Sequence, residues 1–596
     1  MSVRKRIFGD GWIPRSLAVL IEPEVRIRWI GVVLLAVVAA VLESVGALII
    51  FFSMNQIVQG GGETPIDRFL PTISTDETLA VVAVLIGAFF VFRGVFTVAR
   101  AWYAAKTVQT TTARTSDRLF HRYLASAYRT HLMRSSPELI RNAITSVEGV
   151  SSRFLSPLVV IASEAIVIVT MTVVLAAVAP VATLVVAIVL AGSGLVLLSL
   201  VHKRIRAVGH TSEVTARRSL AVLQQSLHDL RGIKVFGREM FFADVFKDER
   251  NAHARARYEM ATLSEIPRVG IETLVFLMIV AFLAVSTVDV AKSSIAVLGL
   301  FAYTALRIMP GVSRVISNLN RVRFSSAAVT NVVNDLQGPE PVFSRRRHGE
   351  APLDWSVLAF TGVGFRYDAA GPEVVHDIDL TIRRGEKLGV VGPTGSGKST
   401  FLDLFLGILE PATGSIAIDG FRLGDVLDSW HDSIGFVAQD VFLLDDSIRR
   451  NVAFGVPDAE IDDGRVWAAL VMAQLAGFVE ASDRGLDTKV GERGVALSGG
   501  ERQRIAIARA LYDDPGVLVF DEATSSLDTA TEKDLLVAIA NLPEAKTVLT
   551  VAHRLSTVRS CDRIIVFSEG GVVGSGTYDD LAQGSEVFRE LVWAAE

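Results

Sequence analysis

The chain has 596 residues, a net charge of -5 and a single cysteine, Cys561, and 50% of its residues are hydrophobic. A chain of this length is too long for one hydrophobic core, so two or more domains are expected. The mean hydropathy of +0.42 is too high for a soluble enzyme of this size. The charge gives no indication of nucleic-acid binding. One cysteine excludes an intramolecular disulfide and a cysteine-rich metal site.

The hydrophobic residues are concentrated before residue 324, in six runs that are each long enough to cross about 30 Å of hydrocarbon. The runs occupy residues 29–54, 78–102, 154–179, 181–201, 269–288 and 294–316. One such run could be a buried core helix, but six in series predict an all-α transmembrane domain of six helices over residues 29–323. Residues 1–28 carry several basic side chains and are expected to be a retained cytoplasmic segment before the first span.

Lysine and arginine are distributed unevenly between the connections of these spans. The second-to-third and fourth-to-fifth connections are rich in them, including Arg114, Arg129 and Arg231, whereas the opposite connections hold little more than Arg68 and Lys292. The positive-inside rule therefore places the N-terminus, both basic loops and the C-terminal half in the cytoplasm. A multi-pass protein of the plasma or inner membrane is expected.

Charged residues within the predicted spans permit two interpretations. The residues concerned are Glu43, Arg93, Glu164, Glu272 and Arg307, with Arg268 near a helix end. Intramembrane charges are costly and either pair with each other or line a wet cavity. They could be structural pairs, or Arg93 and Arg307, with Arg268, could hold an anionic head group such as a pyrophosphate, which guanidinium groups bind in bidentate fashion.

Residues 324–355 are expected to form a polar linker, and residues 356–596 alternate short apolar strands with helices, which is typical of an α/β domain. Within it the segment 392–400 reads GPTGSGKST between a predicted strand and a predicted helix, which is a phosphate-binding loop. The predicted ligands are Gly392, Pro393, Thr394, Gly395, Ser396, Gly397, Lys398, Ser399 and Thr400. Lys398 is expected to reach the β- and γ-phosphates of a nucleoside triphosphate, and Ser399 to bind Mg²⁺.

A second buried strand, residues 517–520, ends in two acidic residues. Asp521 is suited to hold Mg²⁺, and Glu522 is placed to act as general base toward the attacking water, a role worth roughly 10²–10⁴ in rate. Alone, this stretch would be interpreted as a solvated acidic turn. The segment LSGGE at 497–501 precedes it and opens a helix, where paired glycines expose N–H groups to an anion.

The order of these motifs resembles the ATP-binding cassette family over the whole of 356–596, although Glu501 stands where the family's signature usually has glutamine. The resemblance implies that Tyr367 stacks on adenine, although an aromatic there could also be strand core. It implies that Gln439 contacts Mg²⁺, that Asp528 couples two ATP sites, and that His553 contacts the γ-phosphate. Each ATP would lie between one subunit's phosphate loop and another's signature residues, Ser498, Gly499, Gly500 and Glu501.

With six spans and one cassette, the chain resembles a half-transporter of the exporter type, which implies a dimer, in the simplest case a homodimer. Segments near 135–142 and 239–246 resemble the loops that couple the two domains, and the loop motifs resemble those of bacterial lipid-linked oligosaccharide flippases. The predicted function is ATP-driven export of an amphiphilic substrate, with membrane lipids as further partners and no nucleic acid. A multidrug or peptide exporter is the alternative, and an ATP-gated channel or regulator a further one; the six spans exclude a soluble cassette protein of translation.

Overall fold

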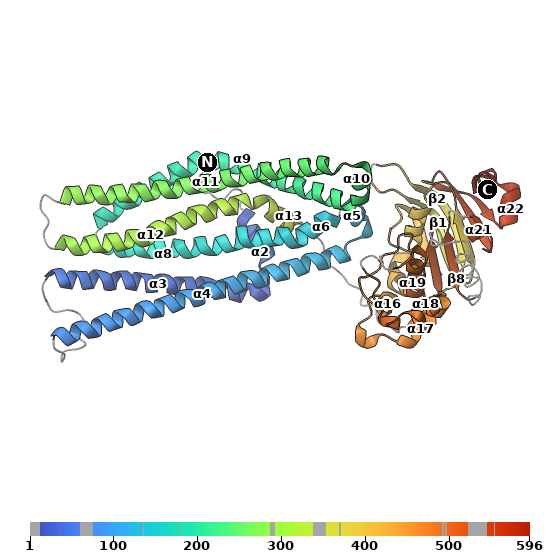
Figure 1. The fold of residues 1–596 in the computed structure, drawn as a ribbon, viewed down its shortest axis with the longest axis horizontal. Helices are drawn as coiled ribbons and strands as arrows, with labels where there is room; N and C mark the ends of the chain where they lie inside the picture. Colours follow the sequence, from blue (N-terminus) through green and yellow to red (C-terminus); the bar gives the residue numbers. More distant parts are fainter. Residues whose placement is uncertain are drawn as a thin grey trace. The chain divides into compact units, whose positions relative to one another are not determined.

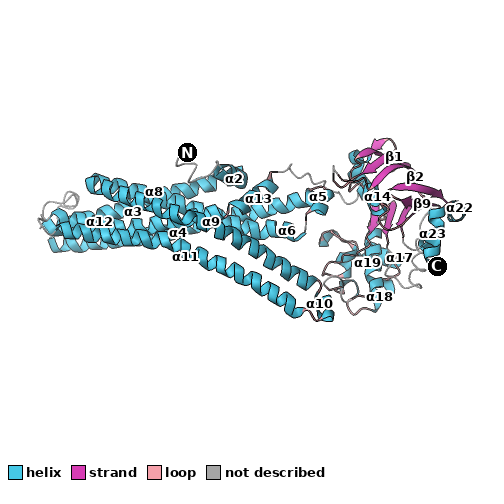
Figure 2. Ribbon diagram, turned by 90° about the horizontal axis from the view of Figure 1, so that it is seen from above, coloured by secondary structure: helices cyan, strands magenta, loops and turns pink. Residues whose placement is uncertain are grey.

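The computed structural model describes residues 12–59, 75–134, 136–178, 180–286, 293–337, 353–368, 371–491, 494, 497–522, 545–552 and 555–595. The chain forms two compact units, each described by itself. The first comprises Met1–Ala125 and Ser135–Pro341, and the second comprises Ser126–Arg134 and Val342–Glu596. The first unit is helical, and the second contains the strands (Figure 2).

Six long helices account for most of the described part of the first unit (Figure 1). They are α3 (Pro23–Gln59), α4 (Thr75–Ala125), α8 (Ser156–Val178), α9 (Pro180–His228), α11 (Glu239–Ser286) and α12 (Ser293–Phe324). Each contains most of one predicted span. Among the described residues, Pro23–Phe52, Ala83–Ala125 and Glu138–Val178 are long and apolar enough to cross a membrane. Large apolar side chains such as Leu34 and Val91 are 60% and 68% exposed, as expected of surfaces solvated by lipid.

Short helices connect and extend the long ones. They are α2 (Trp12–Leu20), α6 (Ser136–Arg141), α7 (Val147–Val150), α10 (Leu230–Phe236), α13 (Ser326–Leu336) and two π-helical turns, η1 (Asn142–Ser146) and η2 (Ser151–Leu155). Helix α9 packs along α11, and α8 packs against α3 and α12. Gly237, with φ of 61°, ends α10 in the left-handed conformation that glycine adopts without strain.

The start of the expected linker is a helix that belongs to the first unit's core. Val329, Val332 and Leu336 recur on one face of α13 and are almost completely buried against Leu20 and Leu119. On the same helix, Asp335 accepts a hydrogen bond of 2.7 Å from the Tyr123 hydroxyl. The linker prediction is therefore wrong for 326–336, because the apolar residues of this segment recur at helical spacing and are buried in the core.

The second unit contains two sheets. The smaller is antiparallel, in the order β2 (Val375–Arg383), β1 (Val357–Phe365), β4 (Thr413–Ile418), β5 (Phe421–Arg422). The larger has the order β10 (Gly571–Gly576), β9 (Arg563–Ser568), β3 (Lys387–Val391), β8 (Thr547–Val551), β7 (Val517–Asp521), β6 (Ile434–Val437). All its neighbouring strands are parallel except β10 and β9. Strands β3, β7 and β8 are almost wholly buried, which explains their continuous apolar sequences.

Helices and short turns complete the described part of the second unit. They are α5 (Tyr128–Met133), α14 (Lys398–Phe405), η3 (Leu423–Val426), α15 (Leu427–Asp432), α16 (Ile448–Val452), η4 (Asp458–Glu460), α17 (Asp463–Met472), α18 (Ala476–Ala481), η5 (Gly485–Asp487), α19 (Gly499–Leu511), α21 (Leu555–Val558), α22 (Tyr578–Gly584) and α23 (Glu586–Ala595).

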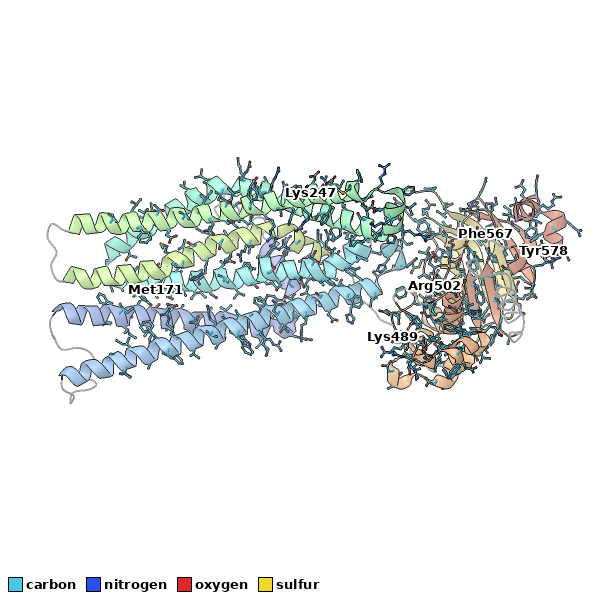
Figure 3. The ribbon with its side chains drawn as sticks, in the orientation of Figure 1. Met171, Lys247, Lys489, Arg502, Phe567 and Tyr578 are labelled. Carbon is cyan, nitrogen blue, oxygen red and sulfur yellow. The ribbon has the colours of Figure 1, made fainter. Side chains whose placement is uncertain are left out.

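Helix α14, which follows the phosphate loop, is anchored in the main core of this unit. Its Phe401 ring lies 5.1 Å from Phe567 and 5.3 Å from Phe360, and its Phe405 ring lies 5.5 Å from Trp430. Figure 3 labels Phe567 within the packed side chains of the sheet. These contacts fix the start of α14 relative to both sheets.

Candidate ATP site and intramembrane charges

Parallel strands bring the predicted catalytic residues to one edge of the larger sheet. The phosphate loop follows β3, Asp521 ends β7, and Gln439 lies two residues beyond the end of β6. Strand β8 joins β3 to β7, with Val551 paired to both Val390 and Asp521. In an open parallel sheet the ligand site lies outside the carboxyl ends of the strands, which is where these residues lie.

Two glycines shape the phosphate loop. A Cβ on Gly392 would lie 2.2 Å from the Phe567 carbonyl oxygen, so no side chain fits there. Gly397 begins α14 with φ of 99°, and a Cβ on it would lie 3.0 Å from the Val374 carbonyl oxygen. The loop can therefore turn tightly into the helix and present its N–H groups to an anion.

The loop also contains polar groups suited to phosphate. The buried Lys398 ammonium donates hydrogen bonds to the carbonyl oxygens of Gly392 at 2.7 Å and Pro393 at 2.9 Å. Burial lowers the pKa of Lys398, and the carboxylates of Glu522 and Asp521 oppose that shift. The Ser396 hydroxyl is buried with no hydrogen-bond partner in the described part of the chain. Since buried polar groups are normally satisfied, this hydroxyl fits a ligand-contacting role.

Glu522 and Gln439 are in direct contact. The Gln439 side-chain amide donates a 2.6 Å hydrogen bond to Glu522 Oε2. Glu522 has φ of 47°, and its backbone N–H donates to the Val551 carbonyl at 2.9 Å, so the side chain is held at the strand edge. A carboxylate held by an amide at the end of β7 is placed to accept a proton from water.

The oxygen donors at this edge fit a small divalent cation. Ser399 contributes a hydroxyl, Asp521 a carboxylate and Gln439 an amide carbonyl, and Mg²⁺ prefers such oxygen ligands completed by phosphates and water. No cluster of three or more histidine, cysteine or carboxylate side chains suited to a metal occurs in the described ranges. The residues thus suit a cation held jointly with nucleotide phosphates.

Tyr367 connects the nucleotide loop to a segment from far earlier in the chain. Its hydroxyl lies 3.0 Å from Thr400 Oγ1, and its ring meets Phe365 edge-on at 5.0 Å. Its carbonyl oxygen accepts two hydrogen bonds from the Arg129 guanidinium, at 2.9 Å from Nε and 2.6 Å from Nη2. Arg129 was predicted only as one of many basic loop residues, and its isolated position in the sequence gives no sign of this contact.

The loop segment that belongs with the second unit lies earlier than the predicted coupling segment. In this loop, Ser126–Arg134, which includes α5, belongs to the second unit. The next helix, α6 (Ser136–Arg141), belongs to the first unit. Extended backbone at Ala127 and Arg134 separates α5 from the helices on either side. The division into units therefore favours 126–134 over the predicted 135–142, and the coupling role itself stays a prediction. The segment 126–134 contains one short helix, which shows no periodicity in the sequence.

The signature segment forms a capped helix start. The Ser498 hydroxyl accepts a hydrogen bond from the Glu501 backbone N–H at 3.3 Å, and the Glu501 carboxylate accepts one from the Ser498 N–H at 2.7 Å. This is a capping box, in which glutamate and glutamine serve equally. Glu501 therefore preserves the helix start, and Gly499 and Gly500 lie in its first turn.

Three predicted site residues cannot be placed. Asp528 and His553 lie outside the described residues, as does the side chain of Arg268. The structure brings together Lys398, Glu522 and Gln439.

Four of the charged residues predicted within the spans, Glu43, Arg93, Glu164 and Arg307, form ion pairs. Arg93 lies 2.6 Å from Glu43, and Arg307 lies 3.0 Å from Glu43 and 3.4 Å from Glu164. Arg314 lies 3.0 Å from Glu164. The two glutamate side chains are only 9% and 10% exposed. These contacts favour the structural interpretation of Arg93 and Arg307 over the ligand interpretation.

The fold and site define a class: a membrane protein whose helical domain is followed by a phosphate-loop ATPase domain. Residues 30–309 match the family described as ABC transporter transmembrane region, and residues 375–525 match ABC transporter. The chain is similar to the ATP-dependent lipid A-core flippases of Alkalilimnicola ehrlichii, 33% identical over 66% of this chain and 67% of that one, and of Ralstonia nicotianae, 33% identical over 69% of each. The chain belongs to the ABC transporter family.

Two further similarities concern exporters. The chain is 37% identical, over 53% of each chain, to the Beta-(1-->2)glucan export ATP-binding/permease protein NdvA of Rhodopseudomonas palustris. The solved structure of a bacterial Atm1-family ABC exporter with ATP bound matches 96% of this chain and 98% of its own, with a TM-score of 0.79 and 25% identity. These findings confirm an ATP-hydrolysing exporter of the half-transporter type, which must associate with another subunit.

Proposed function

We propose that the chain forms a homodimer that exports a lipid-type amphiphile from the cytoplasmic side of the cell membrane, driven by hydrolysis of Mg²⁺-ATP. The observation that carries the proposal is the hydrogen bond between Gln439 and Glu522 at the edge where Lys398 and the phosphate loop lie. This arrangement supports a competent hydrolytic site. The cytoplasmic position of the ATPase domain rests on the arginine-rich loops.

The proposed chemistry assigns each polar group a role. Glu522 accepts a proton from the water that attacks the γ-phosphate, and Gln439 fixes the orientation of the Glu522 carboxylate. Lys398 balances the charge of the β- and γ-phosphates. Ser399, Asp521 and Gln439 would hold Mg²⁺, which supplies neutralisation of phosphate charge. Asp528 and His553 are proposed as the coupling and γ-phosphate residues that the family resemblance implies.

A second subunit would complete each site. The helix N-terminus at Ser498, Gly499 and Gly500 directs N–H groups outward, and an anion at such a terminus is stabilised. We propose that this helix N-terminus contacts the γ-phosphate of the ATP bound by the partner subunit. Because ATP then binds the closed dimer better than the open one, binding favours closure and hydrolysis reverses it.

The relatives' names support a lipid-type substrate. Several are lipid A-core flippases, which favours a lipid substrate over a peptide or drug. The narrower prediction of a lipid-linked oligosaccharide remains a prediction. One relative exports a glucan, so experiments must distinguish a lipid substrate from a soluble glycan.

The decisive variant is Glu522→Gln in the full chain, reconstituted into phosphatidylcholine and phosphatidylglycerol liposomes. Loss of the general base should lower ATP hydrolysis by roughly 10²–10⁴ and stop lipid movement, while ATP binding persists. Glu460→Gln, at an exposed turn, is the control and should be unchanged. Flux that continues in Glu522→Gln upon ATP binding would instead indicate a channel.

A further inference from the structure

Helix α12 carries an arginine ladder, defined as Arg307, Arg314 and Arg321. The seven-residue spacing places all three on one face of the helix, about 10 Å apart. The first two have acidic partners in Glu43 and Glu164. Arg321 is exposed and makes no ion pair in the described part of the chain. The unpaired member lies five residues beyond the predicted span of 294–316, toward the C-terminus of α12.

A cavity of about 1240 Å³ opens beside this ladder, between η2, α9, α11 and α12. Arg314 and Arg321 line it from α12, and Arg257 and Glu272 line it from α11. Arg257 is exposed and, like Arg321, has no ion-pair partner among the described residues. The volume exceeds that of most small-molecule pockets and suits a head group with part of its hydrocarbon.

The two unpaired arginines of the cavity lie at one end of it. Helices α11 and α12 run antiparallel, and Arg257 and Arg321 lie about 42–44 Å from the adjoining ends of the two helices, at 1.5 Å per residue. They are therefore at the same level. Glu272 and Met309 lie about 20 Å closer to those ends. One end of the cavity thus holds two unpaired guanidinium groups, and the other holds Met309, Pro310 and Glu272. Glu265 lines the cavity between these two levels on α11, and Arg153 lines it from η2.

The basic end is held in place by a polar contact between α9 and α11. His253, which also lines the cavity, lies with Nδ1 3.0 Å from the Ser212 carbonyl oxygen. This contact lies four residues, about one helical turn, before Arg257. A fixed backbone beneath an unpaired arginine lowers the entropic cost of binding an anion.

We propose, on the basis of the proposed export function, that Arg257 and Arg321 capture the phosphate of an anionic amphiphile, with its hydrocarbon directed toward Met309 and Pro310. Guanidinium groups bind phosphate in bidentate fashion. Arg93 and Arg307 are already neutralised by buried carboxylates. The proposed capture site therefore consists of two arginines that the sequence analysis did not name, and Arg93 and Arg307 are assigned a structural role.

The test measures binding of phosphatidic acid to the full chain by native mass spectrometry, with dioleoylglycerol and inorganic pyrophosphate as the other probes. The wild type should retain phosphatidic acid in preference to both. Arg257→Ala/Arg321→Ala should lower its retention about tenfold or more. Arg255→Ala, an exposed arginine on α11 that does not line the cavity, should match the wild type.

Basal ATP hydrolysis, measured on the same samples, separates this proposal from the proposed function. The double variant should hydrolyse ATP at the wild-type basal rate, since neither arginine lies in the ATP site. Equal phosphatidic acid retention in all three proteins would overturn the capture site while leaving export intact. If the wild type retained inorganic pyrophosphate as well as it retains phosphatidic acid, the inference that the ligand is an amphiphile would be overturned. Absence of ATP hydrolysis in the wild type would overturn the proposed function instead.

Discussion

At the residue scale, the ATP site depends on a few groups with little freedom. Lys398 and the glycines of its loop are constrained by backbone contacts, and their spacing in the sequence predicts that they bind phosphate. The role of Arg129 could not be predicted, because it depends on a neighbour that is distant in sequence. The capping role of Glu501 could have been predicted, since its spacing of three residues from Ser498 matches a capping box.

Arg129 is expected to control the affinity for ATP. Its guanidinium fixes the Tyr367 carbonyl, so Arg129→Ala should loosen the proposed adenine contact and raise KM for ATP about threefold or more, with kcat less affected. Arg129→Lys keeps the charge but loses the two-point contact and should be intermediate. Steady-state ATPase assays check this, with the exposed Arg484→Ala as control. An unchanged KM in Arg129→Ala would contradict the role of the contact.

Asp403, on α14, should make stability depend on pH. Burial, with the nearby Asp521 carboxylate, raises the pKa of Asp403 from 3.8 to about 6. The folded state therefore binds more protons than the unfolded state between these values, and the stabilisation by protonation is lost as pH rises through about 6. Asp403→Asn should unfold at a higher temperature than the wild type at pH 7.5, with no difference below pH 4.

Thermal unfolding of the full chain in nanodiscs, without nucleotide and with a chelator, measures this difference. The exposed Asp425→Asn is the matched control and should follow the wild type at each pH. If the unfolding temperatures of Asp403→Asn and the wild type changed with pH in parallel, ionisation of the Asp403 carboxyl would not lower the stability of the folded state, and the prediction would be wrong.

At the scale of elements, the ion pairs join α3, α4, α8 and α12. Glu43 on α3 meets Arg93 on α4 and Arg307 on α12, and Glu164 on α8 meets Arg307 and Arg314. The sequence showed which charges lie within the spans but not how they pair, because pairing depends on the packing of helices far apart in the chain. The periodicity of the apolar residues was enough to predict the helices themselves.

A double-mutant cycle tests whether these pairs stabilise the bundle. Arg93→Met leaves Glu43 with only one of its two arginine partners, and Glu43→Gln removes the charge that pairs with both arginines. Each substitution should therefore lower the free energy of unfolding by up to about 3–5 kcal/mol. Arg93→Met/Glu43→Gln should cost less than the sum of the two. Unfolding of the full chain in nanodiscs gives the energies, and strict additivity would exclude a coupled pair.

At the scale of the whole molecule, composition was sufficient to predict two domains of different character, and the strand–loop–helix order was sufficient to predict the α/β ATPase. The division between the units could not be predicted. A nine-residue segment, Ser126–Arg134, belongs with the ATPase although it lies more than 200 residues before it in the chain. Short segments of this kind lack the periodicity on which sequence interpretation depends.

A homodimer with shared sites predicts complementation between two inactive chains. Lys398→Ala removes a chain's own phosphate site, and Ser498→Arg removes the signature that it offers to its partner, so each alone should lose ATP hydrolysis. Co-expressed and purified as a mixed dimer, they should regain hydrolysis, because the intact loop of one meets the intact signature of the other. ATPase assays on doubly tagged dimers measure this, and an inactive mixed dimer would contradict shared sites.

The discontinuous second unit has a consequence for exchanging parts between transporters. A hybrid that receives only Val342–Glu596 from a relative would keep its native α5 against a foreign surface, and Arg129 would face a Tyr367 carbonyl set by another sequence. Grafting Ser126–Arg134 together with the C-terminal part transfers both sides of that contact. The portable cassette of this protein is therefore two pieces of chain, and hybrids joined at a single point divide it.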